Sequence, residues 1–133
     1  MPQGPTLITP GGSGRCRRAL RALECRELLE GVCSRLVYCS RDMVVVETLV
    51  KRGVRVPRHS HEGVQATFVI RGRLLLGVEG RGAEELGPGS YRVIPPGVPH
   101  WAEALEDSLV VDVNAPATPD RLELARRLGA GCG

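Results

Sequence analysis

Short runs of apolar, mostly β-branched residues alternate with turn residues from residue 32 onward. Such runs favour strands, and the Gly, Pro, Asp and Ser residues between them favour turns. Many short strands at even spacing are typical of an all-β sandwich or barrel. The predicted strands are Val32–Cys39, Met43–Val50, Val54–His59, Thr67–Ile70, Leu74–Val78, Ser90–Ile94, His100–Ala104 and Leu109–Val113.

The two ends of the chain have a different pattern. Arg15–Glu30 favours a helix, with leucines as its apolar anchors and Gly31 as its C-terminal stop. Asp120–Leu128 predicts a short closing helix, for which Thr118 or Asp120 is available as the N-cap. Residues 1–14 contain three Pro and four Gly, which predicts a flexible arm or a strand lent to a partner.

Composition indicates one ordinary globular domain, which we place at residues 15–133. Hydrophobic residues make up 42% of the chain and charged residues 25%. The basic residues are scattered and few aromatic rings are available to stack on bases, so we do not expect nucleic acid binding. No apolar run approaches the roughly 20 residues that span a bilayer, and residues 1–14 lack the order of a secretory signal. We therefore expect a cytoplasmic protein without membrane contact.

The five cysteines form no CxxC pair and are odd in number, so they predict neither a zinc knuckle nor a complete disulfide framework. We expect free thiols. A pair between Cys16 and Cys25 is the alternative if the source is a hyperthermophile, because intracellular disulfides occur there.

All three histidines lie beside predicted strand ends. His59 and His61 are two residues apart, so both project from one face of a strand, about 6.5 to 7 Å apart at Cα for a rise of about 3.3 Å per residue. Gln65 follows a short turn that would return its amide oxygen toward the same face. His100 begins a distant strand after a Pro-rich loop. Imidazole is the commonest metal ligand in proteins, so the pattern predicts a metal site.

Two spaced motifs carry a family resemblance. In the first, over residues 53–72, a Gly is followed after five residues by His59-Ser60-His61, then by Gln65 and a closing Gly. In the second, over residues 89–100, a Gly is followed after five residues by Pro-x-Gly and then by His100. At these positions the sequence resembles the cupin superfamily. The resemblance implies a double-stranded β-helix (jelly-roll) barrel, here with the two short terminal helices, and a divalent metal ion held by His59, His61, Gln65 and His100.

The metal set departs from the usual cupin pattern in one respect, because Gln65 stands where many cupins have a glutamate. Three imidazoles and an amide oxygen are neutral, so the charge of a divalent ion stays uncompensated and attracts an anionic oxygen. An amide also cannot transfer protons, which excludes Gln65 as a base. The donor set suits one Zn, Ni, Mn, Fe or Cu ion.

The resemblance implies a metal-dependent enzyme on a small polar or anionic metabolite such as a sugar acid, with isomerase- or lyase-type chemistry. A metal-dependent dioxygenase and a non-catalytic cupin that binds a small ligand are the alternatives, since one fold hosts unrelated chemistries. Small cupins commonly pair, so we expect a homodimer.

Two further residues are candidates for the site. Arg55 has the strand parity of His59 and is predicted to point inward and bind an anionic substrate; a rim arginine after a bulge is the alternative. If Leu105–Asp107 forms a three-residue turn, His100 pairs with Asp112, and Asp112 becomes the catalytic acid/base partner of the metal. A register slip of one residue would turn Asp112 outward instead.

Overall fold

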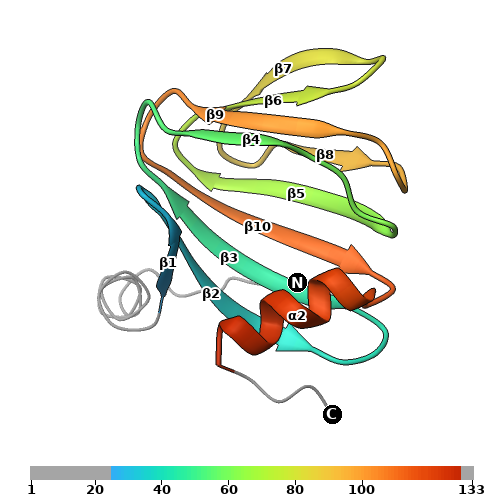
Figure 1. The fold of residues 1–133 in the computed structure, drawn as a ribbon. Coiled ribbons are helices and arrows are strands. Elements are labelled where there is room, and N and C mark those ends of the chain that lie inside the picture. The colour runs from blue at the N-terminus through green and yellow to red at the C-terminus, as the bar shows by residue number, and fades with distance from the viewer. Residues whose placement is uncertain (1–24, 130–133) are drawn as a thin grey trace, which may run out of the picture.

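The computed structural model describes residues 25–129, which form two facing antiparallel sheets and one helix (Figure 1). The six-stranded sheet has the order β1-β2-β3-β10-β5-β8, and the four-stranded sheet has the order β4-β9-β6-β7. The elements are β1 Arg26–Leu29, β2 Val32–Cys39, β3 Val44–Val50, β4 Arg55–His59, β5 Val64–Arg71, β6 Leu74–Val78, β7 Gly82–Leu86, β8 Tyr91–Ile94, β9 His100–Ala104, β10 Ser108–Ala115 and α2 Pro119–Arg127.

Alternating burial along the strands directs one face of each sheet inward. Every second residue of β3 is buried, and β5 alternates in the same way through Gln65, Thr67 and Val69. The two inner faces meet in one apolar core, to which Val50, Leu76 and Ile94 belong. The all-β jelly-roll arrangement predicted from the sequence is thus present in the described part of the chain.

All eight predicted strands are present, and two more were not predicted. Strand β7 is a mostly exposed edge strand that lacks an apolar alternation, and it is held by its pairing with β6. Strand β1 lies where the N-terminal helix was predicted, so that prediction is wrong for Arg26–Leu29. The backbone turns at Gly31, whose φ of 81° favours glycine, and pairs β1 with β2. The rest of the predicted helix and the arm at residues 1–14 lie outside the described residues.

A disulfide joins Cys25 to Cys33 across this hairpin, with the two Cα atoms 5.4 Å apart. The prediction of free thiols is therefore wrong for these two residues and for Cys39, which is disulfide-bonded as well. The alternative pairing of Cys25 with Cys16 is also wrong. Seven residues lie between the two cysteines in sequence, and the antiparallel register of β1 and β2 brings them together.

The segment Leu105–Asp107 forms the predicted short connection, but its two flanking strands do not pair with each other. Strand β9 lies between β4 and β6, whereas β10 lies between β3 and β5 in the other sheet. The predicted pair between His100 and Asp112 is therefore wrong: Asp112 is opposite Val46 and Thr67. The chain turns a corner here and changes sheets, which a hairpin rule does not anticipate.

Helix α2 closes the inner side of the six-stranded sheet. It begins after the predicted N-cap Thr118 and packs against β2 and β3 through a small apolar cluster with Val44, Val46 and Ala125 (Figure 1). The predicted closing helix is confirmed. Within residues 25–129, no helix is long and apolar enough to cross a membrane.

The outer face of the four-stranded sheet contains one tight contact. Gly77 on β6 is directly opposite Trp101 on β9, and the indole ring lies over the glycine. A Cβ atom at Gly77 would come within 2.2 Å of that ring. Only a residue without a side chain fits beneath Trp101.

We expect Gly77→Ala to lower the free energy of unfolding by about 1–3 kcal/mol, because overpacking forces the ring or the strand to move. The measurement is urea unfolding followed by far-ultraviolet circular dichroism. Gly87→Ala is the matched control, since its Cβ would meet only the flexible end of Arg73 at 3.4 Å. Equal unfolding midpoints for the two variants would contradict this account of the contact.

Candidate metal centre

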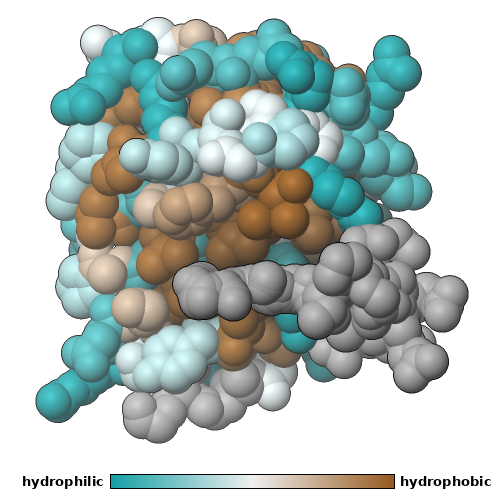
Figure 2. All heavy atoms as spheres, turned by 180° about the vertical axis from the view of Figure 1, so that it is seen from behind, coloured by the Kyte–Doolittle hydropathy of each residue, from teal (hydrophilic) through white to brown (hydrophobic). Residues whose placement is uncertain are grey.

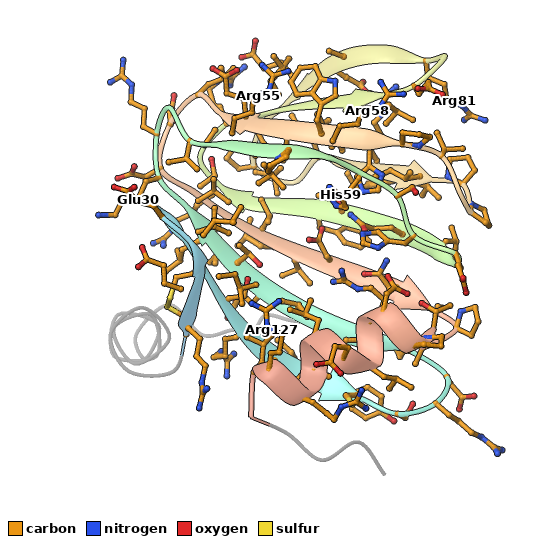
Figure 3. All side chains as sticks on the ribbon, in the orientation of Figure 1. Glu30, Arg55, Arg58, His59, Arg81 and Arg127 are labelled. Atoms are coloured by element: carbon orange, nitrogen blue, oxygen red, sulfur yellow. A yellow bond between two sulfur atoms is a disulfide. The ribbon has the colours of Figure 1, made fainter. Side chains whose placement is uncertain are left out.

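Three histidine rings converge where β4 and β9 run side by side. His59 ends β4 and is paired across the ladder with His100, which begins β9; His61 follows in the loop toward β5. The ring centroids are 4.3 Å apart for His59 and His100, 4.9 Å for His59 and His61, and 5.3 Å for His61 and His100. One potential ligand atom from each residue lies within 4.8 Å of the others. Figure 3 shows His59 between the four-stranded sheet and α2.

Each of the three rings uses its Nδ1 atom for a hydrogen bond to an oxygen acceptor. His59 Nδ1 donates to the carbonyl of Pro57 at 2.7 Å, and His100 Nδ1 donates to the carbonyl of Val98 at 3.0 Å. His61 Nδ1 lies 3.0 Å from Oδ2 of Asp120. Because these partners accept, the proton of each neutral ring belongs on Nδ1, and Nε2 keeps its lone pair.

Two of those Nε2 atoms are buried and have no hydrogen-bond partner, namely those of His61 and His100. Buried polar atoms are almost always paired, and each exception calls for an explanation. A metal ion that accepts the three Nε2 lone pairs would supply an explanation, because it replaces the missing partners at once. The three rings therefore fit a bound metal ion.

Burial also keeps the rings in the form that binds metal. Desolvation lowers the pKa of His61 to about 4 against the opposing effect of Asp120, and it lowers the pKa of His100. At neutral pH both rings are therefore neutral. A neutral imidazole is the state that donates its lone pair to a metal ion.

Gln65 lines the same cavity from β5 and is buried. Its Oε1 accepts a hydrogen bond from Nδ2 of Asn114 at 3.1 Å, and its Nε2 donates to Oγ1 of Thr67 at 3.0 Å. An amide oxygen has two lone pairs, so one acceptor position remains. The fold thus brings the four residues predicted as ligands to one cavity.

Asp112 faces this cavity from β10. Its Oδ1 accepts a hydrogen bond from Oγ1 of Thr67 at 2.7 Å and a longer one from Nε2 of Gln65 at 3.5 Å. Burial raises the pKa of Asp112, while the bond from Thr67 and the charge of Arg121 oppose that shift. The side chain is inward as predicted, although it is placed by pairing with β3 and β5 and not with β9.

Arg55 does not reach the cavity, so its predicted inward orientation is wrong. Its guanidinium lies 4.3 Å from the centre of the Trp101 ring and 3.8 Å from Glu103, on the outer face of the four-stranded sheet (Figure 3). The pairing of β4 with β9 shifts register between Val56 and His59. This irregularity breaks the strict alternation on which the prediction depended.

Helix α2 lines the cavity with charged residues that the sequence analysis did not assign to the site, namely Asp120, Arg121, Glu123 and Arg127. Asp120 accepts hydrogen bonds from His61 and from Thr118, and these bonds lower its pKa although desolvation opposes them. The sequence offered one signal, an adjacent acid and base in the first turn of the predicted helix. Their direction became apparent only when the helix was placed against β2 and β3.

The histidines open on a cavity of about 600 Å³ between the two sheets and α2. This volume is in the range of pockets that hold small molecules. Its walls are mainly apolar, with Val46, Leu76 and Leu124 among them, and Gln65 and Thr67 add polar groups beside the rings. A ligand can thus meet polar groups at the histidine end and apolar walls around it.

Comparisons with known proteins agree with this geometry. A family model of the cupin domain matches residues 45–113. The structure of KdgF from Halomonas sp. is 32% identical, with 72% of this chain and 88% of that chain covered and a TM-score of 0.68. An RmlC-like cupin from Shewanella frigidimarina NCIMB 400 is 23% identical, with 73% and 86% covered and a TM-score of 0.69.

DMSP lyase DddQ from Ruegeria pomeroyi DSS-3 shares the fold at 16% identity, with 84% of this chain and 65% of that chain covered and a TM-score of 0.67. A comparison with curated proteins gives no match. The family model spans more than half of this chain, and the Halomonas structure matches at the level of sequence as well as fold. The chain therefore belongs to the cupin superfamily.

Proposed function

We propose that this cupin is a metal-dependent enzyme that acts on a small polar or anionic metabolite such as a sugar acid, with isomerase- or lyase-type chemistry. The observation that carries the proposal is the pair of buried, unpartnered Nε2 atoms of His61 and His100, which face a cavity of ligand size beside His59. A purely structural histidine cluster would leave these atoms unsatisfied at a cost of about 1–3 kcal/mol each.

The proposed ligands of one divalent transition metal ion are His59, His61, Gln65 and His100. Zn, Ni, Mn, Fe and Cu all suit three imidazoles and an amide oxygen, and geometry does not select among them. When bound, such an ion would act as a Lewis acid toward a carboxylate or carbonyl oxygen of the substrate. The hydrogen bonds that the rings donate to Pro57, Val98 and Asp120 hold the rings in place.

Asp112 is the proposed proton-transfer residue. Its carboxylate faces the cavity, and Thr67 and Gln65 hold its Oδ1 by hydrogen bonds. Gln65 cannot take this role because an amide does not exchange protons at neutral pH. These bonds hold the carboxylate beside the space that a substrate would occupy at the histidine end of the cavity.

A single set of variants tests the metal and the proton-transfer residue. We expect His59→Ala, His61→Ala and His100→Ala to lose most of the bound metal. Gln65→Ala should lose less, because an amide oxygen is a weaker donor than the imidazole that each histidine substitution removes. Asp112→Asn should keep its metal and lose turnover. Elemental analysis of protein purified without chelator measures the metal, and proton NMR of a panel of sugar acids measures turnover.

Ser34→Ala is the control, since Ser34 lines the cavity and bonds to Thr48 without contact to the rings. Parent-like metal content in all four ligand variants would remove the site assignment. Full turnover by Asp112→Asn would remove that residue from the mechanism. Substrate-dependent oxygen uptake would replace the proposal with a dioxygenase, and a metal-free parent protein would favour a non-catalytic binding protein.

The Asp120 carboxylate fixes the ring of His61, so Asp120→Ala should weaken metal binding without removing a ligand. Losses of about 10- to 100-fold in affinity are typical when such an outer hydrogen bond is deleted. Competition titration with Zn²⁺ and a chromophoric chelator measures this effect. Asp42→Ala carries the same charge change in the exposed turn between β2 and β3 and should bind Zn²⁺ like the parent. Equal affinities for the two variants would show that Asp120 does not support the site.

We also propose a homodimer formed through the outer face of the six-stranded sheet. Hydrophobic residues gather in the middle of the face shown in Figure 2. On β5 and the edge strand β8, four large apolar side chains point away from the core and stay 37–62% exposed: Phe68, Ile70, Tyr91 and Val93. Contiguous exposed apolar residues of this kind mark association surfaces, and a second copy offers a matching one.

Ile70→Glu should convert the dimer to a monomer, because it places a charge in the middle of this apolar row. Light scattering coupled to gel filtration at micromolar concentration gives the mass. Arg81→Glu, in the exposed turn between β6 and β7, should leave the dimer intact. A monomeric parent protein would reject the dimer, and a dimeric Ile70→Glu would place its interface elsewhere.

The cytoplasmic location expected from the sequence stays a prediction, and the Cys25–Cys33 disulfide weighs against it because disulfides are rare in reducing compartments.

A further inference from the structure

We infer that Arg121 is the carboxylate-binding residue of the cavity and that its guanidinium receives the anionic end of the ligand. The inference rests on the proposed function, because it assumes that the cavity beside the histidines holds a small molecule. It assigns to α2 the role that sequence analysis gave to Arg55, which lies on the outer face of the other sheet.

The first argument is the incomplete pairing of Arg121. Its side chain lines the cavity, and its Nε is buried with no hydrogen-bond partner. Within residues 25–129, its guanidinium forms neither a hydrogen bond nor an ion pair with another side chain. A buried N–H group without an acceptor is rare, because it loses water without replacement. A ligand that accepts a hydrogen bond from Nε inside the cavity would supply the missing partner.

The second argument is that the two carboxylates whose charges act on Arg121 are engaged elsewhere. Asp120 accepts hydrogen bonds from His61 and Thr118, and Asp112 accepts them from Thr67 and Gln65. Both carboxylates act on Arg121 through their charge, but neither is in ion-pair contact with it. They stabilise the charged form of Arg121 inside the cavity and leave the N–H donors of its guanidinium available to a ligand.

The third argument is the position of Arg121 in its helix. It is the third residue of α2, where the helix dipole is positive and a cation is unfavourable. Helix stability alone therefore does not explain an arginine here. An anion bound beside it would gain from the guanidinium and from the helix N-terminus together.

The fourth argument is the charge of the cavity. The lining contains as many arginines as acids, so a bound divalent ion would leave it with an excess of positive charge; the residues are Arg58, Arg121 and Arg127 against Asp112, Asp120 and Glu123. This excess favours an anionic ligand. A single planar guanidinium matches a planar carboxylate through two parallel hydrogen bonds. One fork gives a tetrahedral phosphate only part of the donors that it needs.

The test uses malonate as the carboxylate probe and inorganic phosphate as the competing anion. Binding is measured by calorimetry on the full chain, with Zn²⁺ loaded and after its removal by chelator. We expect the parent protein to bind malonate more tightly than phosphate. Arg121→Gln should weaken malonate binding by about tenfold or more, and Arg121→Lys should recover part of it because the charge is kept without the fork.

Arg126→Gln is the matched control, because Arg126 lies on the same helix with an exposed side chain paired to Glu123. It should bind malonate within about twofold of the parent. The Zn²⁺ content and the thermal unfolding of Arg121→Gln are measured beside it. Unchanged Zn²⁺ content with weakened malonate binding supports the inference, and it separates the inference from the proposed metal site, whose failure would appear as a parent protein without Zn²⁺.

Four results would overturn the assignment. They are a parent protein that binds no malonate in either metal state, equal malonate affinity for Arg121→Gln and the parent in both states, phosphate binding as tight as malonate binding, and loss of Zn²⁺ from Arg121→Gln. The last result would show that Arg121 supports the metal centre and does not bind the ligand.

Discussion

The convergence of three imidazoles, two of which have buried and unpartnered Nε2 atoms, is the constraint on which the rest of this structure depends. Burying a polar atom without a partner is unfavourable, so the rings stay in place only because other contacts hold them. The ladder between β4 and β9 fixes His59 opposite His100, and carbonyl groups within each strand end fix the ring orientations. The histidine end of the cavity is therefore rigid before any ligand arrives.

The two-sheet architecture supports this arrangement because each layer contributes different side chains to the site. The four-stranded sheet brings His59 and His100, while the six-stranded sheet brings Gln65, Thr67 and Asp112 from the opposite wall. Helix α2 closes the remaining side and adds Asp120 to the ring of His61. Because the groups come from separate layers, each is oriented by its own backbone pairing, and the cavity between them remains open.

The histidine end of the cavity stays polar because its charged side chains are not paired with one another. Desolvation keeps His61 and His100 uncharged, and the hydrogen bonds of Asp112 and Asp120 go to neutral donors. Arg121 is one of the arginines that line the cavity, while Arg55 is held outside by Trp101. A low-dielectric surround strengthens each of these interactions, so a few residues suffice to define the polar end.

The sequence by itself determined the strands with strong apolar alternation, the closing helix and the family motifs, since these depend on local periodicity and spacing. It also identified His59, His61, Gln65 and His100 as candidate ligands. The first three lie within a few residues of one another on one strand and the turn after it, and His100 belongs to the second family motif.

Only the tertiary structure decided features that depend on which strand pairs with which. The register irregularity in β4 turned Arg55 outward, and the corner after β9 sent β10 to the other sheet, where Asp112 faces the cavity by a different pairing. The hairpin of β1 and β2 overrode helix propensity near Cys25. The packing of α2 then brought Asp120 and Arg121 to the site. Long-range pairing, bulges and helix docking leave little trace in local sequence, because their energy comes from contacts between segments far apart in the chain.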